Sequence, residues 1–275
     1  MSELESPARL ASVVYPEPPD LFDPAELYHE ASKLTPATAA RVLAGVAALA
    51  GSPDMQRAVA HASLRHPELP LLHLPAAATL DAPLGAVIAR RRSARTFGVA
   101  PIRSEALAAL LQAAYGVTGS LGGVDGREQP LRAAPSGGAL YPLDAYVAAH
   151  RVEGLAPALY RFDPLASGLE RVGAADPVIE ATASPELVAS AAATFVFAAT
   201  FWRSRFKYGL RAYRFALLEA GHAAQNLLLA ATALDLAAVP LGGFFDRLLD
   251  TTLGLDGVDR SSLYVICVGP PGAME

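Results

Sequence analysis

The sequence has a single cysteine, Cys267, in 275 residues. One thiol excludes an internal disulfide, a cysteine-rich zinc site and an iron–sulfur cluster, and it suits a reducing compartment. Long apolar runs are also missing, since the longest fall well short of the roughly 18 to 20 residues that span a bilayer. The first residues carry acids and prolines where a signal peptide needs a basic and then an apolar stretch. We therefore expect a soluble cytoplasmic protein that does not associate with membranes.

The chain also lacks an excess of positive charge and the best-known sequence fingerprints of catalysis. Its 22 lysines and arginines stand against 27 acidic residues, and the net charge of −5 disfavours nucleic acid as a partner. No GxxxxGK[ST] phosphate loop, GxGxxG turn, HExxH zinc motif or GxSxG elbow is present. The six histidines show no ligand spacing, so we predict no metal site, and we expect His222 to be a core histidine.

With 52% hydrophobic and 18% charged residues, the chain is expected to be globular. We divide it into an N-terminal extension, residues 1–80, and a main domain, residues 81–275. In the extension, Pro36 predicts the first residue of a helix that ends near Gly51. Residues 63–80, which are rich in proline, are expected to be a connecting segment.

The main domain mixes helices and strands without a regular βαβ alternation, which favours an α+β fold. Helices are expected over 84–90 and 105–114, the second capped by Ser104, and the glycine-rich stretch 117–126 should be a surface loop. Residues typical of strands occupy 145–152 and 158–162, as a hairpin, and also 194–202 and 263–268. Before the last strand, spacings of three and four predict a long helix with one apolar face, formed by Leu210, Tyr213, Leu217, Gly221, Ala224, Leu228 and Ala231.

Three segments of the main domain suit an anionic or flat ligand. Arginines surround Ser93 in the segment 90–95, and guanidinium groups bind phosphate oxygens in pairs. Cations that complement the negative end of a helix would give the same pattern. Adjacent glycines in Pro135–Gly138 and in Gly242–Gly243 let a backbone approach a ligand, although a plain tight turn would also explain the first pair.

Lysine is the rare cation of this sequence, because all but Lys33 and Lys207 are arginine. Lys207 lies beside Tyr208 in a basic run that also contains Arg203, Arg205, Arg211 and Arg214. Like charges lower the pKa of a lysine, which suits a base near neutral pH, a task that arginine cannot perform. A solvated helix end with an incidental lysine is the alternative.

In this order and spacing, the segments resemble the nitroreductase-like FMN flavoproteins, and among them the SagB-type dehydrogenases, which include thiazoline and oxazoline oxidases of azole biosynthesis. The likeness covers roughly residues 81–270. RRSARTF is similar to the opening FMN motif of the family, PSGGALYPLDAYV to its flavin-side turn and strand, and KYGLRAYRFALLEAGHAAQNLLLAA to its long helix. YHEASK, at residues 28–33, is similar to an element ahead of the domain in this subgroup. The resemblance implies a nitroreductase-like FMN fold, in which helices surround a central, mostly antiparallel mixed sheet.

The resemblance also implies roles for individual residues. The FMN phosphate and ribityl chain would be held by Arg91, Arg92, Ser93 and Arg95. The isoalloxazine ring would face Pro135, Ser136, Gly137 and Gly138, and its other edge would follow Leu241, Gly242 and Gly243. Lys207 and Tyr208 would be the catalytic pair, and the flavin sites would lie at the interface of a homodimer. The chain departs from the family pattern in its last residues, GPPGAME, which lack a basic residue, so flavin binding should rely on the arginine cluster.

We therefore predict an FMN-dependent dehydrogenase or oxidase that converts a thiazoline or oxazoline in a peptide or peptide-derived substrate to the azole. Lys207, assisted by Tyr208, would take the Cα proton while FMN N5 takes the hydride, and oxygen would reoxidise the flavin. A cyclodehydratase or a carrier protein would be the partner. Two alternatives stay open: an NAD(P)H-dependent nitro or quinone reductase, and an inactive flavin-fold scaffold of a peptide-modifying complex.

Overall fold

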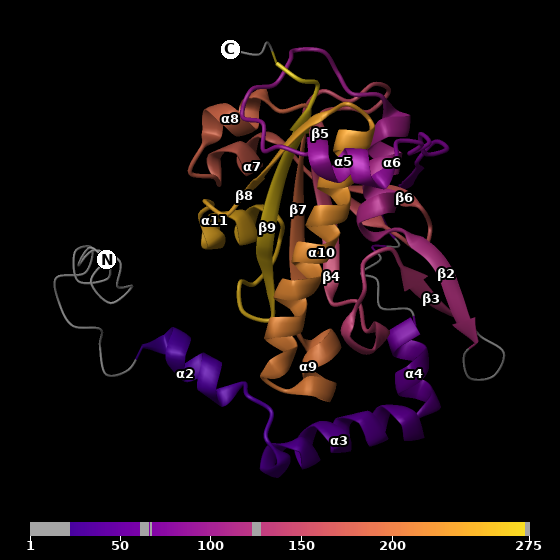
Figure 1. The fold of residues 1–275 in the computed structure, drawn as a ribbon, viewed down its shortest axis with the longest axis vertical. Helices are drawn as coiled ribbons and strands as arrows, with labels where there is room; N and C mark the ends of the chain where they lie inside the picture. Colours follow the sequence, from indigo (N-terminus) through magenta and orange to yellow (C-terminus); the bar gives the residue numbers. More distant parts are fainter. Residues whose placement is uncertain (1–22, 61–65, 67, 123–127, 273–275) are drawn as a thin grey trace. The chain divides into compact units, whose positions relative to one another are not determined.

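The computed structural model describes residues 23–60, 66, 68–122 and 128–272 (Figure 1). It divides into two compact units, residues 1–41 and 42–275. The described part of the first unit holds helix α2, Pro24–Ala31, and the first residues of α3, Pro36–Gly51. The YHEASK segment forms the end of α2 and the turn after it. Among the described helices, none has the length and apolar character needed to cross a membrane.

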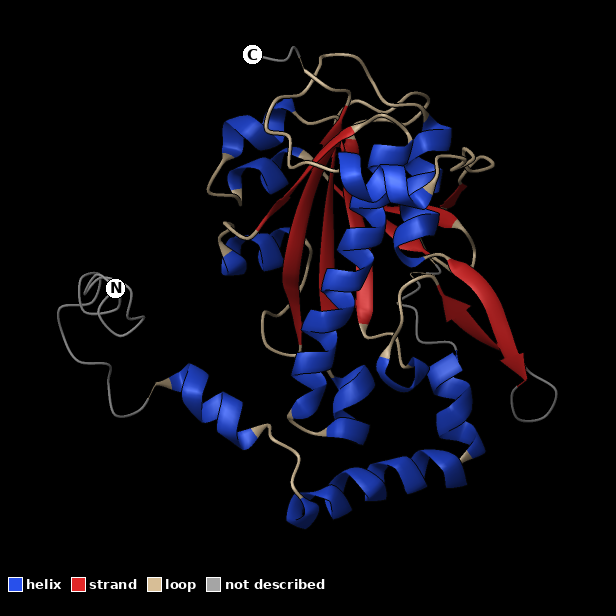
Figure 2. Cartoon of the chain, in the orientation of Figure 1, coloured by secondary structure: helices blue, strands red, loops and turns tan. Residues whose placement is uncertain are grey.

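A seven-stranded sheet forms the centre of the second unit (Figure 2). The strand order is β1-β6-β5-β4-β7-β9-β8, and every neighbouring pair is antiparallel. The strands are β1 (Leu71–His73), β4 (Leu143–Ala149), β5 (Ala158–Asp163), β6 (Gly168–Gly173), β7 (Ala193–Thr200), β8 (Ala237–Leu241) and β9 (Arg260–Gly269). A parallel bridge joins Ser93 to Ala238 of β8. The predicted α+β class and the β4–β5 hairpin are confirmed.

Helices cover both faces of this sheet (Figure 1). The helices over its faces are α5 (Leu84–Arg90), α6 (Ser104–Tyr115), α7 (Asp176–Glu180), α8 (Pro185–Ser190), α10 (Arg211–Ala233) and α11 (Asp246–Thr252). Two further helices lie outside these layers: α4 (Pro53–Ala60) contacts β3, and α9 (Trp202–Tyr208) contacts the start of α10. Side chains of β4 alternate between the faces: Val147 packs in the core below α6 and α10, whereas Tyr146 packs in the core below α7 and α11. Because both faces are covered, β4 is buried along its whole length.

Three local predictions are wrong. The expected loop at 117–126 begins with strand β2 (Val117–Gly122), which pairs with β3 (Glu128–Arg132) in a separate two-stranded sheet, and residues 123–127 lie outside the described part. Cross-strand pairing here overrides the low strand propensity of glycine. The segment 63–80 contains β1, which joins the edge of the main sheet. Ser104 is the first residue of α6 rather than its cap, since Arg103 holds that position without a side-chain bond. The domain boundary at residue 80 stays a prediction.

The long helix is confirmed as α10, but its buried face differs from the predicted one. Ala224, Leu228 and Ala231 are buried as expected, whereas Leu210, Tyr213, Leu217 and Gly221 are exposed. Apart from Glu219, the buried positions in the first half of α10 belong to small residues, Ala212, Ala216, Ala220 and Ala223. Alanines let the helix approach the sheet closely, so the larger leucines of this half face outward.

Candidate functional site

The Gly137–Gly138 turn meets the Lys207–Tyr208 pair. Gly138 has a φ of 66°, and a Cβ atom at this position would lie 2.5 Å from the Tyr208 hydroxyl oxygen and 2.6 Å from Lys207 Nζ. A Cβ atom here would have to displace the ends of both side chains, and the left-handed backbone also favours glycine. Two segments that are distant in the sequence therefore form one site, in which a lysine amine and a tyrosine hydroxyl lie against bare backbone.

The positions of Lys207 and Tyr208 follow from the end of α9. Gly209, with a φ of 56°, ends this helix and turns the chain into α10. The Tyr208 ring packs edge-on against Phe215 of α10, with 5.0 Å between ring centres, and Lys207 Nζ lies 5.1 Å from the Tyr208 ring centre. The backbone of α9 also lies close to α3, since a Cβ atom at Gly45 would lie 2.7 Å from the backbone oxygen of Lys207. Helices α3 and α10 thus both fix the pair.

The turn itself has a strained backbone. Besides Gly138, Ala139 and Tyr141 have positive φ values, 52° and 46°, and non-glycine residues in this region cost on the order of 1 kcal/mol each. Three hydrogen bonds hold the strain: the Tyr141 N–H donates to Ser136 Oγ (2.9 Å), the Gln129 amide donates to the Ala139 carbonyl (3.0 Å), and the Arg132 N–H donates to the Tyr141 hydroxyl (3.0 Å). Such strain is typical of functional sites.

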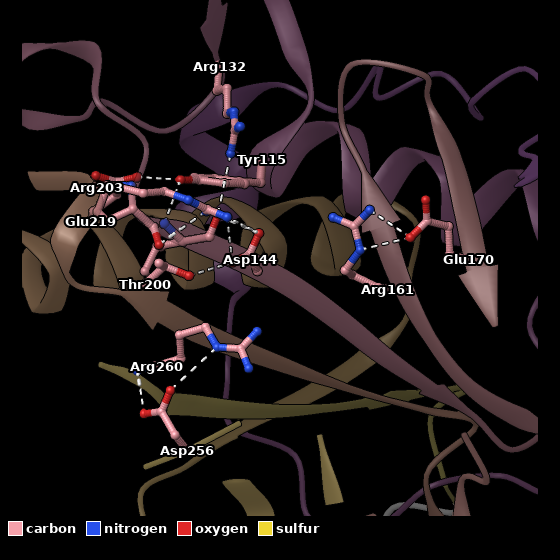
Figure 3. A network of polar contacts seen from close by, with 12 residues as sticks. Tyr115, Arg132, Asp144, Arg161, Glu170, Thr200, Arg203, Glu219, Asp256 and Arg260 are labelled. Atoms are coloured by element: carbon pink, nitrogen blue, oxygen red, sulfur yellow. Dashed lines mark hydrogen bonds and ion pairs between the residues drawn. The ribbon is translucent and has the colours of Figure 1, made fainter. Parts of the chain in front are cut away.

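Figure 3 shows a polar network that includes Glu219, Tyr115 and Asp144. Glu219 of α10 is only 2% exposed, and its Oε1 accepts a hydrogen bond of 2.5 Å from the Tyr115 hydroxyl. The Tyr115 oxygen in turn accepts the Leu143 N–H at 3.2 Å, and the Arg132 guanidinium lies 4.5 Å from the Tyr115 ring centre. The same network contains an ion pair between Arg203 and Asp144, in which a guanidinium nitrogen and a carboxylate oxygen lie 3.0 Å apart.

Burial raises the pKa of the Glu219 carboxyl from its usual 4.5 to about 7. Hydrogen bonds from Ser136 and Tyr115, and the positive charges of Arg132 and Arg203, oppose this shift without cancelling it. Burial and the neighbouring Glu219 also raise the pKa of Tyr115. Within the described residues, Glu219 Oε2 has no hydrogen-bond partner, which leaves this oxygen as the place for a proton.

Replacement of Glu219 by Gln should change how stability depends on pH. The unfolded chain ionises Glu219 from pH 4.5 upward, whereas the folded protein keeps it protonated to about pH 7. The wild type therefore loses stability relative to Glu219→Gln across this window, by about 3 kcal/mol in total, and the difference is constant above it. Urea unfolding between pH 4 and 8.5 measures the effect.

Asp256→Asn is the matched control for this measurement. Hydrogen bonds from the backbone N–H groups of Arg260, Val258 and Asp259 lower the pKa of Asp256 from 3.8 to about 2. Its contribution is present above pH 3.8 and is lost as the pH falls toward 2, so the variant should be parallel to the wild type from pH 4.5 to 7. If the difference in the free energy of unfolding between the wild type and Glu219→Gln is the same at every pH, the raised pKa of the Glu219 carboxyl is wrong.

Glu219 was not among the predicted site residues, and the prediction for His222 is wrong. His222, expected in the core, is exposed, while Glu219, one helical turn earlier, is buried. The signal was available, because Glu219 follows Ala212 and Ala216 at the spacing of the small-residue face of α10. A charged residue on such a face is rarely buried without a partner or a function.

The arginine cluster lies at the other end of α10. Arg90 binds Asp235 (3.1 Å) and the Thr232 carbonyl (3.0 Å), and Arg92 binds the carbonyls of Ala89 and Arg91 at the end of α5 (2.8 Å each). These two arginines thus complement helix ends. For the side chains of Arg91, Ser93 and Arg95, the described residues provide no hydrogen-bond partner, so these groups are available to a ligand.

The third predicted segment, 241–243, follows the strand that neighbours this cluster. Ser93 bridges to Ala238, and the Ala94 N–H donates to the Ala238 carbonyl at 3.0 Å. Strand β8 then leads to Gly242, around which a Cβ atom would meet nothing within 4 Å. The last residue of the segment, Gly243, fixes its position, because its carbonyl accepts the Ala183 N–H at 2.9 Å.

The predicted cofactor residues therefore fall into two groups within one chain. The turn group, Pro135–Gly138 with Lys207 and Tyr208, packs near Phe215 of α10. The arginine group, 91–95, lies near Thr232 at the far end of the same helix, and β8 leads from it back along the sheet to Leu241, which is level with Tyr146 of β4. At a rise of 1.5 Å per residue, Phe215 and Thr232 are about 25 Å apart along the helix. This separation exceeds the length of one flavin mononucleotide.

Comparison with known proteins places the fold. The profile of the nitroreductase family matches residues 88–270. The protein MJ1384 of Methanocaldococcus jannaschii, named as a nitroreductase, is 33% identical over 164 residues, which are 58% of this chain and 79% of the relative. The microcin B17-processing protein McbC of Escherichia coli is 29% identical over 130 residues, 44% of this chain and 48% of McbC.

Solved structures agree with this assignment. A crystal structure of a Ralstonia eutropha protein named as a nitroreductase has a TM-score of 0.63 and 29% identity, and covers 77% of this chain and 94% of its own. A chain of the Escherichia coli McbBCD microcin synthetase, solved with truncated pro-MccB17 bound, has a TM-score of 0.59 and 22% identity and shares the fold over 96% of this chain and 98% of its own. The chain belongs to the nitroreductase family of flavin-dependent oxidoreductases.

Proposed function

We propose that this chain is an FMN-dependent dehydrogenase of the SagB type, which oxidises a thiazoline or oxazoline in a peptide or peptide-derived substrate to the azole. The observation that carries the proposal is the meeting of Lys207 and Tyr208 with Gly138. Aromatising an azoline removes a proton and a hydride equivalent from adjacent carbons, so the site needs a base beside the hydride acceptor. A lysine and a tyrosine against a glycine turn provide such a base.

The residues present fit FMN. Available Arg91, Ser93 and Arg95 side chains suit its phosphate, since arginine binds phosphate oxygens bidentately. The bare backbone at Gly138 and the open space around Gly242 suit a flat ring system. When bound, FMN supplies the acceptor for the hydride equivalent.

The protein side of the reaction falls to the turn group. Lys207 Nζ accepts the substrate proton, and the Tyr208 hydroxyl, which lies against the same glycine, orients the amine and the substrate by hydrogen bonding. The edge-on contact with Phe215 keeps the Tyr208 ring in one position. The strained, hydrogen-bonded turn keeps Gly138 close enough for substrate and cofactor to approach both groups.

The enzyme acts as a homodimer in this proposal, with each flavin site built from two copies. One copy supplies the arginine group and the other supplies the turn group, because a single chain holds them too far apart. Exposed apolar side chains support association: Leu217 and Leu218 on α10 are 44% and 60% exposed, and Leu84 and Ile88 on α5 are 65% and 56% exposed.

Replacement of Gly138 by Ala should lower azoline oxidation about a hundredfold, because the new Cβ would displace the Lys207 amine and the Tyr208 hydroxyl. Mass spectrometry of a thiazoline peptide, scoring the loss of two hydrogens per ring, measures the effect. Gly154→Ala is the matched control, since Gly154 has a φ of 71° but nothing within 4 Å of its Cβ position. If both variants lose the same share of azoline oxidation activity, the cause is backbone strain at a left-handed glycine and not crowding of Lys207 and Tyr208.

Similarity to McbC supports a peptide substrate, since that relative is a processing protein of microcin B17. A cyclodehydratase would supply the azoline rings, and it or a carrier protein would be the partner. The second candidate is an NAD(P)H-dependent nitro or quinone reductase, which the archaeal relative named as a nitroreductase favours.

A further inference from the structure

We propose that Asp144 of β4 and Arg203 of α9 are positioning residues, whose ion pair holds the Lys207 amine against the Gly138 turn. Both act through the backbone that connects them to the site. The proposed function gives the position of Lys207 its catalytic meaning, whereas the position itself can be measured without cofactor or substrate.

The contact between Asp144 and Arg203 is two-pronged and shielded from water (Figure 3). Nη1 and Nη2 of Arg203 both donate to Asp144 Oδ1 at 3.1 Å, and Nη2 lies 3.0 Å from Oδ2. The Thr200 hydroxyl adds a third hydrogen bond, which it donates to Asp144 Oδ2 at 3.1 Å. The Asp144 and Arg203 side chains are only 7% and 11% exposed. Because a guanidinium that is bound through two nitrogens has a fixed orientation, the pair fixes the direction of α9 as well as its distance from β4.

Short stretches of chain connect this pair to both halves of the site. Asp144 belongs to β4, the strand that directly follows the strained turn. Arg203 lies in the first turn of α9, and Lys207 follows one helical turn later on the same side of the helix. Lys207 Nζ in turn lies 2.6 Å from the Cβ position of Gly138. The turn and α9 are therefore joined at two points, the ion pair and the site itself.

Helix α9 depends on contacts of this kind because it is short and buries little of its own surface. It has seven residues, and Ser204 is its one buried residue. Helices much shorter than roughly 12 residues are not stable by themselves, so their neighbours must hold them. Phe215 packs against Tyr208 at the end of α9, whereas Asp144 binds the first turn. Loss of the second contact would let α9 tilt and would move the Lys207 amine away from the turn.

A second buried ion pair provides a matched control. Arg161 of β5 and Glu170 of β6 lie 2.7 Å apart, and their side chains are 0% and 1% exposed. Arg161 also grips through two nitrogens, since Nε and Nη2 both donate to Glu170 Oε2. This pair joins two neighbouring strands of the sheet and belongs neither to α9 nor to the turn (Figure 3). A change at Arg161 therefore disturbs a similar pair without loosening α9.

Labelling of lysine amines in the full-length protein without FMN measures the position of Lys207. Lys33 and Lys207 are the two lysines of the sequence, so the rate of acetylation by sulfosuccinimidyl acetate at Lys33 serves as the internal reference. Arg203→Lys keeps the charge but loses the fork. It should raise the Lys207 rate relative to Lys33 about tenfold, which corresponds to the loss of one hydrogen bond to a charged group. Trypsin cuts after Arg205, so mass spectrometry separates Lys207 from position 203. Arg161→Lys should leave the ratio unchanged.

A double-mutant cycle shows whether the two residues act through their contact. Asp144→Asn keeps the shape of the side chain and removes its charge, so it should also raise the Lys207 ratio. The double variant Asp144→Asn with Arg203→Lys should give no larger ratio than the stronger single variant. If the two single effects multiply in the double variant, the residues act independently and the inference is overturned.

Thr200→Val provides a test that changes no charge, and it decides the question where the charge variants do not fold. It removes one hydrogen bond to Asp144 and should raise the Lys207 ratio by a smaller factor, about threefold. A wild-type ratio in Thr200→Val and in a folded Arg203→Lys would overturn the inference. An equal rise in Arg161→Lys would do so as well, because the cause would then be a general loss of stability.

The kinetic consequence is measured separately with the FMN-loaded enzyme. Arg203→Lys should lower kcat for a thiazoline peptide about tenfold and leave KM unchanged, since the lysine is displaced while the other substrate contacts remain. Arg161→Lys should keep the wild-type kcat. A wild-type kcat in Arg203→Lys would show that Arg203 does not position the base. If the wild type itself does not oxidise the peptide, the proposed function fails, while the labelling ratio still decides whether the ion pair holds Lys207.

Discussion

Replacement of Lys207 by Ala should lower azoline oxidation by about 10²- to 10⁴-fold, the usual contribution of a general base. FMN should remain bound, because Lys207 belongs to the turn group and the phosphate-binding residues lie at the other end of α10. The physical reason is the position of Nζ, 2.6 Å from where a Gly138 Cβ would be, beside the Tyr208 hydroxyl. Peptide oxidation followed by mass spectrometry gives the rate, and the flavin absorbance gives the occupancy.

Two variants sharpen this experiment. Lys207→Arg keeps the positive charge but stays protonated, so it should be as inactive as Lys207→Ala. Lys33→Ala removes the other lysine, which pairs with Glu30 at the end of α2, and should keep full activity. If Lys207→Arg oxidises the peptide at the wild-type rate, residue 207 provides only a positive charge. Lys207 is then not the base.

A mixture of two inactive variants should regain activity. Lys207→Ala damages the turn group, and the double variant Arg91→Ala with Arg95→Ala damages the arginine group. If each site combines groups from two copies, a heterodimer has one intact site and one site with both defects. An equal mixture, unfolded and refolded together, should therefore recover up to about a quarter of the wild-type activity.

The control for this mixture is each variant refolded alone, which should stay inactive. Failure of the mixture to exceed the single variants, with heterodimers present by differential tagging, would place both groups of a site in one chain. The 25 Å or so between Phe215 and Thr232 along α10 argues for the shared arrangement.

The sequence predicted the elements of the fold better than it predicted their faces. Strands β4, β5, β7 and β9 and helix α10 follow from strand propensity and apolar spacing. The buried face of α10 did not, because periodicity counts leucines as core while packing against the sheet selected alanines. Strand β2 was missed because its glycines suppress the strand signal, and pairing with β3 is a long-range effect.

The candidate site was predictable only in part. Lys207 was conspicuous as a rare lysine and Gly138 as half of a glycine pair, yet nothing in their local sequence indicates that they meet. Their contact depends on how α9 ends and on where α10 crosses the sheet. Glu219 could have been found as an acid on a small-residue helix face, but its partners Tyr115 and Ser136 come from other parts of the chain.

The most direct test of the proposed function is the visible spectrum of the purified, FMN-loaded protein mixed anaerobically with a thiazoline peptide and, separately, with NADPH. We expect the thiazoline peptide to bleach the flavin band and to be converted to the thiazole, while NADPH leaves the band unchanged. Rapid bleaching by NADPH, with no effect of the peptide, would contradict the proposed function and identify the protein as a reductase.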